Sequence, residues 1–376
     1  QAVLPPQLRP NLKLLHTLGF TGDITQQLNQ AKKHNPRALS AAFSASSMWA
    51  ANAATVTPSS DTKDQRVHFT TANLVDHLHR HQEADTSKKL FEQIFSDATH
   101  FVHHDILPKT PDYNDEGAAN HNRLAKTHDA PGLYIFVYDR DEKSPHTHFP
   151  ARQTLAASQA IARQHTLTTH QALFIAQNPK AIDAGVFHND VISLANASVF
   201  LVHQDAFLEQ ADFLKQLQQH ANFDLNIIQI NRDEISLEEA VKTYLFNAQL
   251  VTLPDTANMA LIAPIECQTS KSVSAFIDNL VLDAHNPIQA VHYVALKQSM
   301  RNGGGHACLR LRVLLTEAEL GAMHQGILIT HDLLDTLDAH ITQHYRTALC
   351  LDDLADPRLV DEAAAAHEAL MKMLGL

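Results

Sequence analysis

Residues Arg301–Val313 read RNGGGHACLRLRV, a glycine loop followed by alternating polar and apolar side chains. Three consecutive glycines lose much backbone entropy on folding, so such a loop is typical of a place where the backbone approaches another group closely. The alternation predicts a strand with Cys308, Arg310 and Arg312 on one face. Cationic neighbours lower the pKa of a thiol and favour the thiolate. The stretch therefore predicts a nucleophilic cysteine; the alternative is a small, buried structural cysteine.

The composition is that of a globular protein. The chain has 376 residues, 44% of them hydrophobic, and a formal net charge of −12. This charge argues against a nucleic-acid partner, and no apolar run approaches the roughly 20 residues that span a bilayer, so we expect no membrane partner. The three cysteines, Cys267, Cys308 and Cys350, lack metal-binding spacing. Their odd number favours a reducing, cytoplasmic compartment and one reactive thiol over a disulfide framework.

Histidine is unusually frequent, with 26 residues. Because histidine is the commonest metal ligand, a zinc site has to be considered. The sequence contains neither a His-Glu-x-x-His motif nor a paired Cys-x-x-Cys. We interpret the histidines as surface residues and expect no metal and no cofactor. Three stretches concentrate them: His77–His81, His103–Asp105 and His146–His148.

Predicted strands and helices mingle along the chain, which indicates a mixed α/β fold. A module of strands and one helix recurs, and no linker rich in proline, serine or glycine divides the chain. The patterns predict strands at Val67–Thr70, Leu133–Tyr138, Ala172–Ala176, Ile227–Ile230, Met259–Ile265 and Ala290–Leu296. They predict helices starting near Asp23 and at the capping box Ser236–Glu239, and helices over Thr86–His100, Ala151–Arg163, Asp205–His220, Val273–Leu282, Thr330–Leu349 and Asp361–Leu374.

A thiol nucleophile needs a base, and the base needs an orienting partner. A predicted hairpin, with strands Val186–Leu194 and Ser198–His203, offers His188 and Asp190 on one face by period-two alternation. A surface hairpin edge is the alternative interpretation. The polar loop Asp112–Arg123 offers Glu116, although loop carboxylates are usually just solvated. Spacing alone does not bring these groups together with Cys308, because they lie far apart in the sequence.

Five segments together carry a family resemblance. The segments occur in the same order as in the family and extend over nearly the whole chain. No single segment identifies the family, but the five together are highly specific. They are Met48–Thr55 (MWAANAAT), Gly117–Leu124 (GAANHNRL), Pro150–Thr154 (PARQT), Gly185–Val191 (GVFHNDV) and Asn302–Gly305 (NGGG). In these segments the chain resembles the N-succinylarginine dihydrolases, bacterial enzymes of arginine catabolism.

The resemblance implies a fold and an activity. The fold is the pentein, a five-bladed α/β propeller, here as a single catalytic domain over residues 1–376. The activity is hydrolysis of N2-succinyl-L-arginine with two waters to N2-succinyl-L-ornithine, two ammonia and carbon dioxide, without metal or cofactor, in a cytoplasmic homodimer. The implied catalytic residues are Cys308 as nucleophile, His188 as general acid and base, and Glu116 as its acidic partner.

The resemblance also implies a substrate-binding set. Asp190 would hold the guanidinium by charge-assisted hydrogen bonds. Arg80 and Arg152 would bind the carboxylates of the substrate. The complete set is Asn52, His79, Arg80, Arg152, Asp190 and Asn302.

The sequence also departs from the family. We expect that the family's N-terminal segment, rich in glycine and serine, is absent before Gln1 and that its tail is absent beyond Leu376. His306 stands where we expect a proline, which should loosen the loop beside Cys308 and add a titratable group there.

Three alternatives stay open. A one-step guanidine deiminase of the arginine or dimethylarginine type would release a single ammonia. A non-catalytic pentein that acts as a binding module would not need Cys308, His188 and Glu116 together. A metallohydrolase built on the histidine clusters is the most remote, and it would be sensitive to chelators.

Overall fold

The computed structural model describes residues 1–141 and 147–376. His146, from one of the histidine clusters, lies outside the described residues. The chain divides into two compact units. The helical unit comprises Gln1–Met48, Val75–Asp97 and Ala318–Leu376, and the sheet unit comprises Trp49–Leu74 and Ala98–Glu317. That residues 1–376 act as one catalytic domain stays a prediction.

Four three-stranded sheets make up the sheet unit, counted over the described residues. In each sheet the first two strands are antiparallel, and the third is parallel to the second. The recurring module predicted from the sequence is therefore confirmed. The sheets are β1 (Ala54–Thr57), β2 (Val67–Thr71) and β3 (Phe101–His103); β4 (His121–Leu124), β5 (Leu133–Tyr138) and β6 (Ala172–Ala176); β7 (Ser193–Asn196), β8 (Val199–His203) and β9 (Asn226–Ile230); and β10 (Gln249–Thr252), β11 (Met259–Pro264) and β12 (Ile288–Val294).

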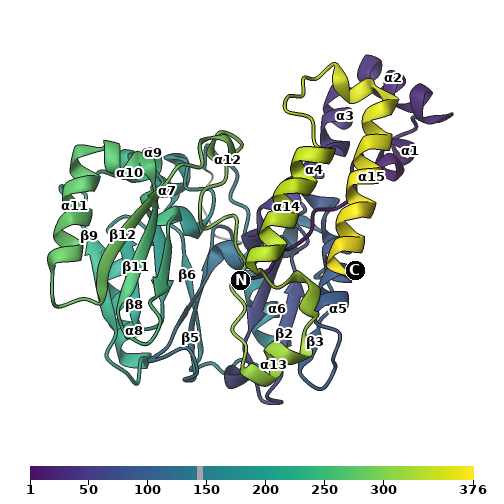
Figure 1. The fold of residues 1–376 in the computed structure, drawn as a ribbon. Helices are drawn as coiled ribbons and strands as arrows, with labels where there is room; N and C mark the ends of the chain where they lie inside the picture. The colour runs from purple at the N-terminus through teal and green to yellow at the C-terminus, as the bar shows by residue number, and fades with distance from the viewer. Residues whose placement is uncertain (142–146) are drawn as a thin grey trace. The chain divides into compact units, whose positions relative to one another are not determined.

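A helix connects the second and third strands of each sheet, because parallel strands need a crossover connection. These helices are α5 (Ala84–Ile94), which belongs to the helical unit, α6 (Leu155–Gln164), α8 (Gln210–His220) and α11 (Lys271–Leu282). Helix α11 packs against β12 of its own sheet (Figure 1). The other helices of the sheet unit are α7 (Pro179–Asp183), α9 (Leu237–Thr243), α10 (Ile265–Thr269) and α12 (Lys297–Arg301).

A short 3₁₀ turn precedes the first strand of every sheet. The turns are η2 (Ala50–Asn52), η5 (Gly117–Asn120), η6 (Asn189–Val191) and η7 (Leu245–Asn247). Turn η2 contacts η5, η5 contacts η6, and η6 contacts η7. The repeated topology thus collects four segments that are far apart in the sequence.

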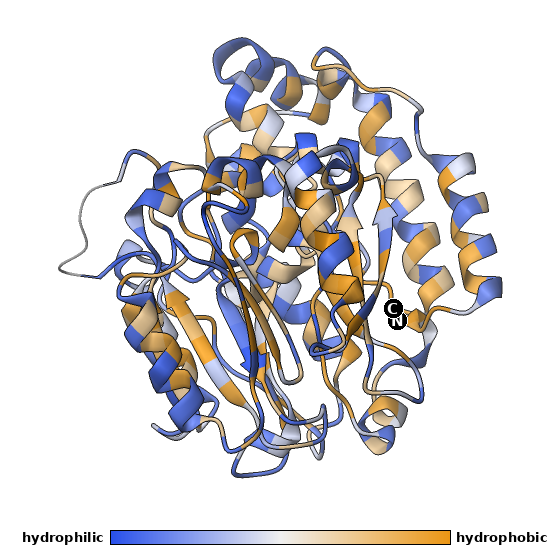
Figure 2. Ribbon diagram, turned by 90° about the vertical axis from the view of Figure 1, so that its left-hand side faces the viewer, coloured by the Kyte–Doolittle hydropathy of each residue, from blue (hydrophilic) through white to orange (hydrophobic). Residues whose placement is uncertain are grey.

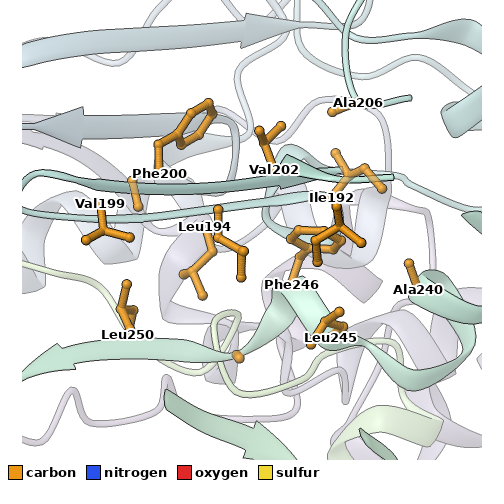
Figure 3. Packing of buried hydrophobic residues seen from close by; sticks show 14 of the residues in the cluster. Ile192, Leu194, Val199, Phe200, Val202, Ala206, Ala240, Leu245, Phe246 and Leu250 are labelled. Carbon is orange, nitrogen blue, oxygen red and sulfur yellow. The ribbon is translucent and has the colours of Figure 1, made fainter. Parts of the chain in front are cut away.

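The core of the sheet unit is a continuous apolar cluster that spans the last three sheets. Figure 3 shows side chains from β7, β8 and the segment around Phe246 packing against one another. Phe200 and Phe246 are both completely buried. Burying apolar area contributes about 25 cal/mol per Å² to stability. Several strands are accordingly apolar along their length, whereas the helices carry mixed faces (Figure 2).

The helical unit has a separate small core in which Leu15, Leu28, Leu39 and Val360 pack together. Helix α2 begins after Asp23, as predicted, and a complete capping box satisfies its first backbone amides. The helices of this unit are α1 (Leu12–Thr17), α2 (Ile24–His34), α3 (Pro36–Ala42), α4 (Leu78–His81), α5, α13 (Glu317–Ala322), α14 (His331–His344) and α15 (Pro357–Leu374). No helix among the described residues is long and apolar enough to cross a membrane.

All six predicted single strands are present, with ends that differ by a few residues. Several helices differ more at one end. Those predicted over Thr86–His100 and Thr330–Leu349 end at Ile94 and His344. The helix predicted from Asp205 begins only at Gln210, because Glu209 has the left-handed conformation with φ of 49°. The helix capped by Ser236 ends at Thr243, because Tyr244 is left-handed as well.

Two predicted strands near the site are wrong. Residues after Cys308 form a turn, in which the amide of Arg310 bonds to the carbonyl of Ala307 at 3.3 Å. The first hairpin strand begins at Ser193, and the residues that follow His188 form η6. Period-two alternation misleads in both places, because polar contacts to neighbouring loops replace ladder pairing.

The interpretation of the histidines as surface residues is also wrong in part. Among the described residues, six histidines are buried: His68, His165, His188, His203, His306 and His340. Among the described residues, no group of three or more His, Cys, Asp or Glu side chains is arranged to hold a metal ion.

Three histidines form a cluster between β2, β3 and α6. His165 is completely buried, with Nδ1 2.7 Å from Oγ1 of Thr57 and Nε2 2.8 Å from Oγ1 of Thr70. His104 stacks on it, and Nε2 of His104 lies 3.1 Å from Nδ1 of His68. Burial lowers the pKa of all three, that of His104 to about 4.

We expect the free energy of unfolding to fall as the pH drops below about 6.5. The unfolded chain then binds protons that the buried imidazoles do not, so the stability they contribute is present above that pH and lost below it. His104→Gln should reduce this pH dependence, measured as the urea midpoint against pH, because it removes one such ring. His292→Gln, at an exposed position of β12, is the matched control. Equal slopes in wild type and H104Q would contradict the prediction.

Candidate active site

The 3₁₀ turns and the glycine loop position a thiol against two polar side chains. Cys308 is 2% exposed. Its Sγ donates to Oδ2 of Asp190 at 3.3 Å and accepts a hydrogen bond from Nδ2 of Asn247 at 3.1 Å. Asp190 comes from η6 and Asn247 from η7, so two sheets contribute to the surroundings of the thiol.

The predicted lowering of the thiol pKa is wrong for this structure. Burial raises the pKa of Cys308 well above its usual value, and the carboxylate of Asp190 raises it further. The hydrogen bond from Asn247 acts in the opposite direction but is outweighed. The thiol is therefore protonated in the absence of a substrate, because a buried thiolate beside a carboxylate is unfavourable.

The glycine loop allows the close approach that its sequence predicted. Gly303 has φ of +96°, which favours glycine. A Cβ on Gly304 would lie 1.9 Å from Nε1 of Trp49, and one on Gly305 would lie 2.5 Å from Oδ1 of Asn247. The loop thus packs directly on the side chain that contacts the thiol.

A histidine–carboxylate pair is the second part of the site. Nε2 of His188 lies 2.7 Å from Oε2 of Glu116, and both side chains are almost fully buried. Such a bond fixes the orientation of the imidazole and stabilises its protonated form. The structure therefore brings His188 together with Glu116, and Cys308 together with Asp190.

Hydrogen bonds to neighbouring chain segments hold the Glu116 loop. The amide of Glu116 donates to Oε1 of Gln153 at 2.7 Å, and its carbonyl accepts from Nδ2 of Asn52 at 2.7 Å. Nε2 of Gln153 donates to Oδ1 of Asp115, a buried carboxyl whose pKa burial raises to about 6. Asn52 thus lies beside the Glu116 loop and donates to its backbone.

The loop that carries His188 is anchored in the same way. The amide of Asn189 donates to Oδ1 of Asn120 at 2.7 Å. Oδ1 of Asn189 accepts from Oγ of Ser193 at 2.6 Å. The backbone and the side chain of Asn189 therefore both hold the turn between His188 and Asp190.

Four further residues belong to the substrate-binding set that the resemblance implies, and they lie in different elements of the two units. The guanidinium of Arg152 lies 5.5 Å from the ring centroid of Phe187, whose ring in turn contacts His188. Asn302 is exposed at the end of α12 and donates to the carbonyl of Gln298. His79 and Arg80 belong to α4 of the helical unit, where Arg80 is buried.

His306 is buried beside the glycine loop. Burial lowers the pKa of its imidazole, and Glu266 and the backbone of Val294 offset this effect in part. Its carbonyl accepts from Nε2 of Gln249 at 2.8 Å, so the backbone at this position is held despite the missing proline.

Sequence reasoning missed three residues that position the site: Asn247, Gln153 and Asn120. Gln153 and Asn120 lie inside segments that carry the resemblance. Asn247 lies in no recognisable motif, and only its contacts with Cys308 and Ala307 identify it.

The site combines a buried thiol beside a carboxylate with a histidine oriented by a second carboxylate. Cysteine-dependent hydrolases and transferases use a thiol nucleophile with such an oriented base. The model of one family, described as succinylarginine dihydrolase, matches residues 1–376. The chain therefore belongs to the succinylarginine dihydrolase family, and the resemblance in its sequence is confirmed.

Curated relatives support this assignment over the full chain. An N-succinylarginine dihydrolase of Legionella pneumophila (strain Paris) is 57% identical over all of this chain and 85% of its own length. The enzymes of the same name from Chromohalobacter salexigens and Aeromonas hydrophila are 50% and 48% identical, with the same coverage. Among solved structures, an amidinotransferase from Microseira wollei matches 73% of each chain with a TM-score of 0.45 and 12% identity.

Asp190→Asn should make Cys308 more reactive toward iodoacetamide near neutral pH. Removing the carboxylate next to Sγ lowers the pKa of the thiol and raises the thiolate fraction, by about tenfold. Mass spectrometry of the peptide that contains Cys308 measures the alkylation rate against pH. Asp212→Asn, at an exposed position of α8, should leave the rate unchanged. An unchanged or slower rate in D190N would contradict the prediction.

Asn247→Asp should have the opposite effect on the same measurement. It keeps an oxygen that accepts from the amide of Ala307 but replaces the donor to Sγ with a second carboxylate. Alkylation of Cys308 should slow about tenfold or more, because a hydrogen bond to a charged group contributes about 1.5–3 kcal/mol. Asn279→Asp, on the exposed side of α11, is the control. Alkylation as fast as in wild type would show that Asn247 does not stabilise the thiolate.

Proposed function

We propose that this protein hydrolyses N2-succinyl-L-arginine to N2-succinyl-L-ornithine, two molecules of ammonia and carbon dioxide. The observation that carries the proposal is the pairing of Cys308 with Asp190 and of His188 with Glu116 in a chain of the succinylarginine dihydrolase family. In this proposal the four sheets are modules of a five-bladed pentein propeller, and residues 1–376 act as one catalytic domain.

Asp190 binds the guanidinium group of the substrate. Its carboxylate offers charge-assisted hydrogen bonds, which are about twice as strong as neutral ones. Arg152 binds a substrate carboxylate, and its guanidinium lies over Phe187 next to His188. Asn52, His79, Arg80 and Asn302 complete the proposed binding set on the basis of the family resemblance.

The substrate itself activates the thiol. The raised pKa of Cys308 comes from burial and from Asp190, and a bound guanidinium cation offsets both effects. The thiolate therefore forms once the positive charge is in place. This order protects the resting enzyme from adventitious alkylation and oxidation, because the thiolate is the reactive form.

In the first round the thiol of Cys308 gives its proton to His188, and the thiolate attacks the guanidino carbon. His188 donates a proton to the departing nitrogen, which leaves as ammonia, and a covalent thiouronium remains. His188 then takes a proton from water, which attacks the same carbon and expels the thiolate. Glu116 orients His188 and stabilises its charged form throughout. The product of this round is a ureido compound.

The second round starts from the thiolate that hydrolysis of the thiouronium has released, and it repeats the attack on the neutral ureido carbon. Attack by the thiolate releases the second ammonia and leaves a thiocarbamate on Cys308. Water, activated by His188, converts it into a carbamate, which loses carbon dioxide and leaves N2-succinylornithine. Every proton transfer in this mechanism uses His188. The buried carboxylate of Glu116 holds its imidazole in one orientation for these transfers.

In this proposal the protein acts in the cytoplasm, where a reducing environment keeps a catalytic thiol reduced. The three cysteines are free in the structure. A homodimer stays a prediction from the family resemblance, and light scattering on the purified protein would test it.

The ammonia released per N2-succinylarginine consumed tests the function, with the carbon product identified by mass. We expect two ammonia and succinylornithine for the wild type. Cys308→Ala should abolish turnover, whereas Cys350→Ala, which removes an exposed thiol of the helical unit, should retain it.

Other outcomes would favour the alternatives. A single ammonia and a stable ureido product would mean a one-step deiminase. Substrate binding without ammonia would mean a binding module, and loss of activity on chelation would favour a metallohydrolase. Substantial turnover by C308A would exclude the thiol mechanism.

A further inference from the structure

A small cavity lies inside the sheet unit, among the first strands of the sheets. Its volume is about 110 Å³, and its walls come from β1, β4 and β7 and from residues 307–314. Cys308, His188 and Glu116 are not part of its lining, although Asp190 is. Pockets for drug-sized ligands have about 300–1,000 Å³. The cavity therefore fits a small ion with a few waters rather than the substrate.

Arginine dominates the charged lining, which contains Arg123, Arg310 and Arg312. Arg123 is neutralised, because its Nε lies 2.6 Å from Oδ2 of buried Asp61. The charges of the other two have to be compensated elsewhere.

Arg312 donates only to neutral groups. Its two terminal nitrogens bond to the carbonyls of Ala195 at 3.1 Å and Leu250 at 2.9 Å. Its pKa is lowered by burial and further by the neighbouring Arg310, and no carboxylate acts on it. Arg312 is half-buried, and a cation held by carbonyl oxygens alone keeps its full charge.

Nε of Arg310 is buried and has no hydrogen-bond partner among the described residues. Asp190 is the carboxylate that lines the cavity and favours the charged form of Arg310. One carboxylate compensates one of the two arginines. His121 and His128 add no charge, because burial lowers the pKa of both imidazoles. The lining thus carries one excess positive charge.

We propose that this cavity binds one small monovalent anion, such as chloride, beside Arg310 and Arg312. An uncompensated charge that is largely removed from water is unfavourable, so a group of opposite charge is expected next to it. Arginine hydrogens that face the cavity are suitable donors for an anion. The inference does not depend on the proposed reaction, because it rests on charges and hydrogen bonds alone.

Thermal unfolding of the full chain tests the proposal. Sodium chloride should raise the midpoint temperature in a saturating way compared with sodium gluconate at equal ionic strength, because gluconate is too large for the cavity. Arg312→Met should abolish this chloride-specific increase, even if the substitution itself changes the midpoint temperature in gluconate. Arg232→Met, which removes an exposed arginine of the sheet unit, should retain it.

A second measurement does not require a variant. Crystals of the wild type grown or soaked in sodium bromide should give an anomalous scattering peak in the cavity beside Arg310 and Arg312. Equal midpoints in chloride and gluconate, or a cavity that holds water without an anomalous peak, would overturn the proposal. Persistence of the chloride increment in R312M would overturn it as well.

Discussion

The contact between successive 3₁₀ turns is the constraint on which the site depends. Each sheet begins with a strand that follows such a turn, and η2, η5, η6 and η7 touch in sequence. Asn52, Asn120, Asp190 and Asn247 lie in these turns. The repeated topology therefore explains how residues separated by about sixty positions meet, because the crossover helix of each sheet returns the chain to the same end.

Negative charge controls the electrostatics of the site. Glu116 and Asp190 are joined by Asp115 and Asp139, buried carboxyls whose pKa values burial raises to about 6 and about 7. This environment favours a cationic ligand and disfavours a free thiolate. The arginines behind the site have the opposite role. Arg310 and Arg312 line a cavity that Asp190 also lines, and Asp190 accepts a hydrogen bond from the thiol of Cys308. Asp190 therefore contacts both the cationic cavity and the thiol.

Local patterns predicted the elements well where the core decides them. Strands such as β5 and β11 follow from short apolar runs, which have few ways to be buried other than in a sheet. The same reasoning failed for the segments after Cys308 and His188, which look like strands. There the backbone bonds to other loops, for example when the carbonyl of Cys308 accepts from the amide of Ala51. Periodicity records only the local preference of a segment and not these long-range partners.

The sequence by itself determined the family and the mixed α/β class. It predicts Cys308, His188 and Glu116 as the reactive groups, because a thiol nucleophile needs a base and the base needs an orienting partner. Only the tertiary structure decided the state of the thiol. Burial and the carboxylate of Asp190 raise its pKa, whereas the arginines seen next to it in the sequence turn toward a cavity. The role of Asn247 is likewise visible only in space, since a hydrogen bond to sulfur across sixty residues leaves no local signal.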